Sequence, residues 1–240
     1  MIDFYYWPTP NGWKVAILIE ELGAGYRMIP VDIGRGDQFA PAFLAISPNG
    51  RMPAIVDHDT GGAPVPVFES GAIMWYLAEK FGRFLPDGPL ARKEAMEWLF
   101  WQVGNQGPMA GQLSHFVNYA PPAQQAYGKK RYGREYERCL GVLERRLDGR
   151  PYILGADCSI ADMIAWPWVL IAKPLGIALD PYPRVSDWRA RIKERPAVQR
   201  AVDLGKEYRR AGPPSDEARR ILYAETLEDG TAAVEEGAAE

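Results

Sequence analysis

Residues 7–12 read Trp7-Pro8-Thr9-Pro10-Asn11-Gly12, a turn sequence that separates an apolar strand from a helix. The segment before it, Ile2 to Tyr6, is the short apolar run expected of a buried strand. After it, apolar residues recur at helical spacing until Gly23 interrupts the pattern. The chain therefore begins as a strand, a turn and a helix, the first unit of an α/β domain.

The next sixty residues continue the same alternation. The sequence predicts an α/β domain with the order β-α-β-α-β-β-α over residues 1–82. Its later elements are expected at 26–31 (strand), 38–46 (short helix), 54–57 and 65–68 (strands) and about 73–80 (helix).

A second, all-α domain is predicted to follow. A linker is predicted over residues 83–90, because Gly82, Pro86, Gly88 and Pro89 interrupt both helix and strand. Residues 91–212 are helical in pattern and rich in large apolar side chains, and Ser159 to Asp162 has the spacing of a capping box. Residues 213–240 form an Ala-, Gly- and Glu-rich tail, which we expect to be mobile apart from a possible helix at 217–227.

Composition narrows the function. The 240 residues are 47% hydrophobic and carry a formal charge of -3, so we expect no nucleic-acid partner. No apolar run of membrane-spanning length and no signal peptide are visible, which predicts a cytoplasmic protein without a membrane partner. Cys139 and Cys158 are not in a CxxC pair, and neither His58 nor His115 belongs to a metal motif, so we expect packed thiols and no metal.

Two further stretches accompany residues 7–12: Asn49-Gly50-Arg51-Met52-Pro53-Ala54 and Phe68-Glu69-Ser70-Gly71-Ala72-Ile73. Together the three resemble the thioredoxin-like half of glutathione transferases. The resemblance implies the glutathione transferase fold, an α/β thioredoxin-like N-terminal domain plus an all-α C-terminal domain. It also implies a homodimer that takes glutathione, reduced or as the disulfide, as its co-substrate.

The same resemblance assigns residues to glutathione. Arg51, Met52 and Pro53 would form a loop with a cis peptide bond before Pro53, and the main chain of Met52 would pair with the cysteinyl part of glutathione. Glu69 would bind the γ-glutamyl ammonium and Ser70 its carboxylate, at a helix N-terminus that favours anions. Ser70 could equally be only an N-cap.

The first stretch decides the chemistry. Thioredoxin-like redox proteins carry two cysteines in this turn, whereas here Thr9 and Asn11 occupy it, so the reacting sulfur must come from glutathione. A free thiol has a pKa of about 8.5, and two hydrogen bonds of roughly 1.5 to 3 kcal/mol each can lower it by one to two units. Thr9 and Asn11 are therefore the predicted catalytic residues. Tyr5 and Tyr6 are alternative sulfur ligands.

Within the superfamily the closest resemblance is to the Nu-class bacterial transferases, which are also related to the yeast prion-forming nitrogen regulator. It extends over about 210 residues and includes Trp98-Leu99-Phe100-Trp101-Gln102, Gly107-Pro108-Met109 and Trp166-Pro167-Trp168. It implies disulfide reduction through bound glutathione, with conjugation or reductive ether cleavage as alternatives, and a non-catalytic binding module as a further one.

Carry-over from that subgroup places two further residues at glutathione. Gln38 would lie on the glycyl carboxylate, and Arg131 would reach glutathione across the dimer interface, unless it is only part of a solvated helix face. Phe116, Tyr119, Tyr127 and Trp168 are candidate walls of the second-substrate pocket, although Trp168 fits a core position better. Trp13, beside the turn, would narrow that pocket.

Overall fold

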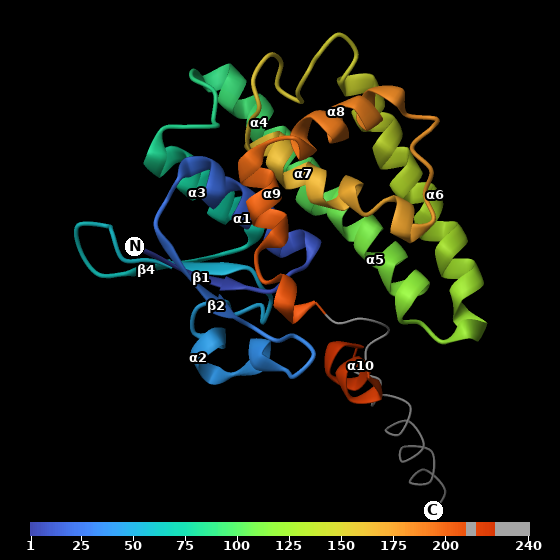
Figure 1. Ribbon diagram of the computed structural model, residues 1–240, viewed down its shortest axis with the longest axis horizontal. Helices are drawn as coiled ribbons and strands as arrows, with labels where there is room; N and C mark the ends of the chain where they lie inside the picture. Colours follow the sequence, from blue (N-terminus) through green and yellow to red (C-terminus); the bar gives the residue numbers. More distant parts are fainter. Residues whose placement is uncertain (210–214, 224–240) are drawn as a thin grey trace, which may run out of the picture.

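The computed structural model describes residues 1–209 and 215–223. It shows an α/β unit packed beside a helical one (Figure 1). The sheet contains β1 (Ile2–Tyr6), β2 (Tyr26–Pro30), β3 (Ala54–Asp57) and β4 (Val65–Phe68) in the order β2-β1-β3-β4. β1 and β2 are parallel, and the other two pairs are antiparallel. This mixed sheet and the helices around it confirm the predicted fold class.

Three helices accompany the sheet: α1 (Pro10–Leu22), α2 (Pro41–Leu44) and α3 (Ser70–Phe81). α1 is buried nearly all round, as its almost continuous apolar sequence requires. It contacts α3 and, from the helical unit, α7 (Ile160–Leu170) and α9 (Pro196–Asp203). Arg195 reinforces the contact with a two-pronged ion pair to Glu21, at 2.5 and 2.9 Å. The turn before α1 is thus held between the two units.

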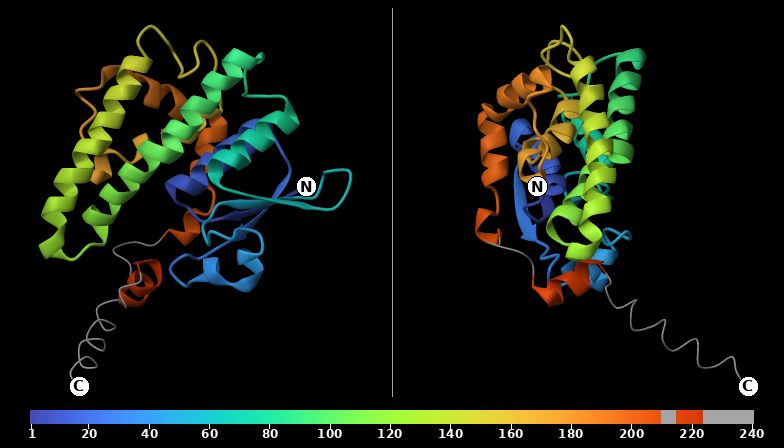
Figure 2. Two further views of the ribbon diagram at one scale, coloured as in Figure 1. Left: turned by 180° about the vertical axis from the view of Figure 1, so that it is seen from behind. Right: turned by 90° about the vertical axis from the view of Figure 1, so that its right-hand side faces the viewer.

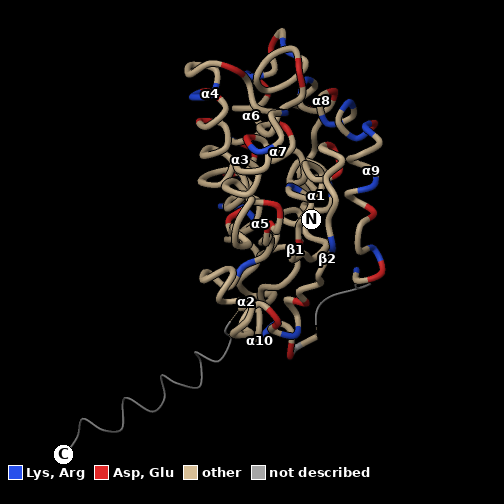
Figure 3. The backbone as a smooth tube through the Cα atoms, turned by 90° about the vertical axis from the view of Figure 1, so that its left-hand side faces the viewer, with Lys and Arg blue, Asp and Glu red and all other residues tan. Residues whose placement is uncertain are grey.

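The helical unit opens with α4 (Pro89–Trp101), a π-helical turn (Gln102–Gln106) and α5 (Gly107–Asn118). The long α6 (Pro122–Arg146) runs back beside α5 (Figure 2). Then come α7, α8 (Pro183–Lys193), α9 and α10 (Asp216–Tyr223), with short 3₁₀ turns at Asp37–Phe39, Lys173–Leu175 and Lys206–Tyr208. Charges of both signs are interspersed along the described chain (Figure 3).

Two local predictions can be compared directly with these elements. The capping box is present at the start of α7, where the Ser159 amide donates to the Asp162 carboxylate at 2.9 Å. The possible helix at 217–227 is described as far as Tyr223. The division into 1–82, 83–90, 91–212 and a tail stays a prediction, and residues 210–214 and 224–240 lie outside the described part of the chain.

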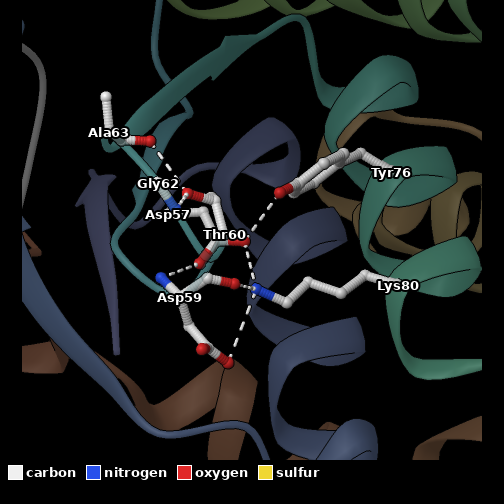
Figure 4. Close-up of polar contacts among 7 residues, drawn as sticks. All are labelled: Asp57, Asp59, Thr60, Gly62, Ala63, Tyr76 and Lys80. Carbon is white, nitrogen blue, oxygen red and sulfur yellow. Dashed lines mark hydrogen bonds and ion pairs between the residues drawn. The ribbon is translucent and has the colours of Figure 1, made fainter.

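A buried polar cluster fixes β3 against α3 (Figure 4). The Asp57 carboxylate is fully buried at the end of β3. It accepts hydrogen bonds from the Tyr76 hydroxyl at 2.7 Å and from the Lys80 ammonium at 2.5 Å. Burial raises the pKa of Asp57, but these two hydrogen bonds, a third from the Asp59 amide and the charge of Lys80 together outweigh it, so the net pKa lies below the usual value. The cluster holds α3 in place relative to the strand that follows Pro53.

Candidate active site

The register of the sheet brings the three sequence stretches to one edge. Tyr5 pairs with Ala54, and Ala54 pairs with Phe68 on its other side. The turn after β1, the loop before β3 and the segment after β4 therefore begin at neighbouring points. At this edge Thr9 meets Met52 across 43 residues of sequence, and Asn49 meets Glu69 across 20.

Thr9 caps the helix that follows the turn. Its hydroxyl oxygen accepts a hydrogen bond from the Gly12 amide at 3.3 Å, and its hydroxyl donates to the Met52 sulfur at 3.6 Å. A thioether is a weak acceptor. A thiolate beside Met52 could therefore replace the thioether as the acceptor of the Thr9 hydroxyl hydrogen bond, while the Thr9 oxygen still accepts from the Gly12 amide.

Asn11 lies two residues further on, partly exposed, at the first turn of α1. Its Oδ1 accepts a hydrogen bond from Nε1 of Trp168 at 3.3 Å. Trp168 is only 7% exposed, so the preference for a core position over a pocket wall is correct. The bond to Asn11 was not predicted.

The loop before β3 has the expected form. The Met52–Pro53 peptide bond is cis, and the side chain of Met52 is almost fully buried. Arg51 is exposed, and its carbonyl accepts a hydrogen bond from the Ser47 hydroxyl at 2.8 Å. The main chain is thereby held in a fixed shape beside Thr9.

At α3, Ser70 is the first helical residue and Glu69 is the N-cap, so the interpretation of Ser70 as an N-cap was wrong. Glu69 has a φ of 68°, which is unusual for a residue with a side chain. Its carboxylate is exposed and accepts a hydrogen bond from Nδ2 of Asn49 at 3.2 Å. Strained backbone is commonly retained at functional positions, and here it places a carboxylate beside a helix N-terminus.

Gln38 and Arg131 make their hydrogen bonds and ion pairs away from the Thr9 turn. Gln38 is 1% exposed, its Nε2 donates to the Ile33 carbonyl at 3.2 Å, and its Oε1 has no hydrogen-bond partner within the described residues. Arg131, on α6, is exposed and pairs with Glu135 of the same helix at 2.9 Å. The structure does not bring either side chain to the Thr9 turn, so their roles rest on the resemblance alone.

Tyr5 and Tyr6, the alternative sulfur ligands, have side chains that contact other parts of the protein. The Tyr6 hydroxyl donates to the Leu204 carbonyl at 3.1 Å, the side chain is fully buried, and burial raises its pKa. Tyr5 packs against Phe43 on α2, with ring centroids 5.8 Å apart. Thr9 and Asn11 remain the better candidates.

A buried lysine near the site was not predicted. Lys14, one turn after Asn11, is 3% exposed, and its ammonium donates to Oε1 of Gln102 at 2.8 Å. Burial lowers the pKa of Lys14 to about 7, and the charge of Glu69 opposes that shift. The signal in the sequence was a single charged residue inside the apolar run from Trp13 to Ile19.

The aromatic side chains that are candidates for lining the second-substrate pocket lie in different environments. Tyr119 and His115 meet Tyr223 of α10, at centroid distances of 5.1 and 4.5 Å, which brings α10 against the end of α5. Phe116 stacks on Tyr132 of α6 at 5.5 Å. Tyr127 is 78% exposed and contributes no packed wall.

In residues 1–209 and 215–223, no helix has the length and apolar character needed to cross a membrane. The same residues contain no group of three or more His, Cys, Asp or Glu side chains suited to a metal ion.

The glutathione S-transferase N-terminal domain family matches residues 1–79, and the glutathione S-transferase C-terminal domain family matches residues 126–191. The chain belongs to the glutathione S-transferase family. This transferase is 49% identical over 204 residues to the disulfide-bond oxidoreductase YfcG of Escherichia coli, covering 84% of this chain and 94% of that one.

Solved structures of glutathione transferases share this fold, and two of them hold glutathione or its disulfide. The glutathione transferase of Burkholderia graminis, with two glutathione molecules per subunit, has a TM-score of 0.81 and 42% identity, covering 85% of this chain and 88% of that one. The glutathione transferase of Pseudomonas putida, with one glutathione disulfide per subunit, has a TM-score of 0.79 and 39% identity, covering 85% and 91%. The predicted family and fold are thereby confirmed.

Proposed function

We propose that this transferase reduces disulfides with the thiolate of bound glutathione, and that the same thiolate conjugates electrophilic carbon in suitable substrates. The observation that supports this most directly is the turn after β1, where Thr9 and Asn11 stand in place of protein cysteines beside the Met52 loop. The relative named as a disulfide-bond oxidoreductase and the neighbour holding glutathione disulfide support disulfide chemistry.

The reaction follows from one activated sulfur. The glutathione thiolate attacks one sulfur of the substrate disulfide, a new S–S bond forms, the old one breaks, and the leaving thiolate takes a proton from water. A second glutathione then attacks the mixed disulfide, releasing the second thiol and glutathione disulfide. Two glutathione molecules are oxidised for each disulfide reduced.

We assign the binding roles as follows. The main chain of Met52, shaped by Arg51 and Pro53, pairs with the cysteinyl unit. Glu69 holds the γ-glutamyl ammonium, and Ser70 with the N-terminus of α3 holds its carboxylate. Gln38 takes the glycyl carboxylate through its second Nε2 proton, and Arg131 approaches from a partner subunit.

We propose a homodimer of Nu-class type. Large apolar side chains are exposed on two consecutive helices: Phe81 of α3, and Leu90, Met96 and Phe100 of α4. Exposed apolar groups gathered in this way favour burial in an interface. Cys139 and Cys158 are both free thiols, which fits a reducing, cytoplasmic location with its own glutathione supply.

Steady-state turnover of hydroxyethyl disulfide and of a chlorodinitrobenzene with glutathione tests the proposal. Thr9→Ala and Asn11→Ala should each lower kcat/KM roughly tenfold or more, because each removes a hydrogen bond to a charged acceptor. Thr60→Ala, in an exposed loop, serves as the control and should match the wild type. Absence of glutathione binding by calorimetry, or activity that survives both substitutions and disappears in Tyr6→Phe, would contradict the assignment.

A further inference from the structure

The indole of Trp168 determines which way the Asn11 amide faces. An indole nitrogen can only donate a hydrogen bond, so the Asn11 atom 3.3 Å from it must be the oxygen. The ambiguity between oxygen and nitrogen that usually attends an asparagine side chain is therefore resolved by chemistry. Nδ2, the donor end, has no hydrogen-bond partner among the described residues and is available to a ligand.

Trp168 is itself held rigidly. Its carbonyl accepts a hydrogen bond from the fully buried Tyr136 hydroxyl at 2.8 Å. Its ring lies along the face of α5 that carries Gly107 and Gly111, where an added Cβ would lie 3.5 Å from Nε1 and 3.6 Å from Cη2, respectively. Both distances are those of ordinary van der Waals contact, so the flat ring lies directly beside these two positions, which are one helical turn apart. The indole N–H therefore has a fixed position and direction.

We infer that Trp168 is a positioning residue that orients the Asn11 amide so that Nδ2 donates to the glutathione sulfur. This inference rests on the proposed role of Asn11. Without the indole, the amide rotates between two orientations, one of which turns an acceptor oxygen towards the thiolate and repels it. The bond thus spares the site the reorganisation that would otherwise accompany thiolate formation.

Trp166 provides a matched control on the same helix. Its indole is also buried and donates to a carbonyl, that of Arg189, at 2.9 Å. Replacing either tryptophan by phenylalanine removes one indole hydrogen bond and keeps an aromatic side chain. Of the two indoles, that of Trp168 is the one hydrogen-bonded to a residue of the sulfur site. General loss of packing therefore affects both variants, and loss of positioning affects one.

The test is a pH titration of thiolate absorbance for glutathione bound to the wild type and to Trp168→Phe, Trp166→Phe, Asn11→Ala and the double variant Asn11→Ala/Trp168→Phe. We expect Trp168→Phe to raise the pKa of the bound thiol by about half a unit to one unit, which lowers the thiolate fraction at neutral pH by up to about three- and tenfold, respectively. Trp166→Phe should leave the thiol pKa unchanged. In the Asn11→Ala background, Trp168→Phe should add nothing further.

A wild-type thiol pKa in Trp168→Phe, while Asn11→Ala raises it, would overturn the positioning role and leave the proposed function standing. An unchanged pKa in Asn11→Ala would overturn the sulfur assignment itself. Trp168→His, whose ring N–H can donate again, should recover part of the shift. This variant keeps the test decisive if Trp168→Phe folds poorly, because failure to recover relative to Trp168→Leu would contradict the inference.

Discussion

Replacing the buried lysine of α1 by methionine should stabilise the protein at neutral pH. Unfolding returns Lys14 to water and to its ordinary pKa of 10.5, whereas in the folded protein burial lowers that pKa to about 7. At about 1.4 kcal/mol for each pH unit between the two values, keeping Lys14 buried costs about 5 kcal/mol at pH 7. Lys14→Met removes this cost but leaves Oε1 of Gln102 without its donor, which costs about 1 to 3 kcal/mol. The expected net gain is about 2 to 4 kcal/mol.

The pH dependence has a definite sign. Because the folded-state pKa is the lower one, the unfolded chain binds one more proton between about pH 7 and pH 10.5. Wild-type stability therefore rises relative to Lys14→Met as the pH increases through this window, and the disadvantage is fully expressed only below pH 7. From pH 7 to pH 10 the difference between the two proteins should change by about 4 kcal/mol.

Urea unfolding followed by tryptophan fluorescence, at constant protein concentration and at several pH values from 7 to 10, measures this difference. Lys193→Met, in an exposed position on α8, is the control and should show no such change. A difference between Lys14→Met and wild type that stays constant over this range would refute the reasoning. Lys14 would then remain charged when folded, with Glu69 offsetting the cost of burial.

Three further predictions concern residues that support the site or are proposed to bind glutathione. Asp57→Asn should lower the free energy of unfolding by about 3 kcal/mol at pH 7, because it leaves the Lys80 ammonium without its buried partner. Since the folded-state pKa of Asp57 is lowered, its contribution to the free energy of unfolding is present above the unfolded pKa of 3.8 and is lost as the pH falls through the folded pKa. Equal stability of Asp57→Asn and wild type in denaturant unfolding at pH 7 would contradict this. Gly12→Ala should destabilise the protein by more than 1 kcal/mol in thermal unfolding, because the new methyl group would lie 2.3 Å from the Trp7 carbonyl oxygen; an unchanged Tm would show that the turn can move aside. Arg131→Ala should raise the Kd for glutathione severalfold in calorimetry and change the free energy of unfolding by no more than about 0.5 kcal/mol. An unchanged Kd would show that Arg131 only pairs with Glu135 on a solvated helix face.

Much of the α/β unit could be predicted because local patterns determine it. The strands Ile2–Tyr6, Ala54–Asp57 and Val65–Phe68 were predicted with their observed bounds, since short apolar runs between turn residues give a clear signal. The expected helix at 38–46 proved to be a 3₁₀ turn followed by the short α2, because Pro41 starts a new helix within it. Thr9, Met52 and Glu69 could be proposed as site residues because each lies in a motif whose residues are contiguous.

The tertiary structure decided how those motifs are completed. Asn11 meets Trp168 across 157 residues, and Lys14 meets Gln102 across 88. Periodicity shows that a side chain is buried, but it does not show which polar group lies opposite, because that depends on how α1 packs against α7 and on the π-helical turn before α5. The sequence by itself determined that the reacting sulfur belongs to glutathione, since the turn lacks cysteine. Only the packing of the two units determined which way the Asn11 amide faces, because its oxygen accepts the hydrogen bond of the Trp168 indole.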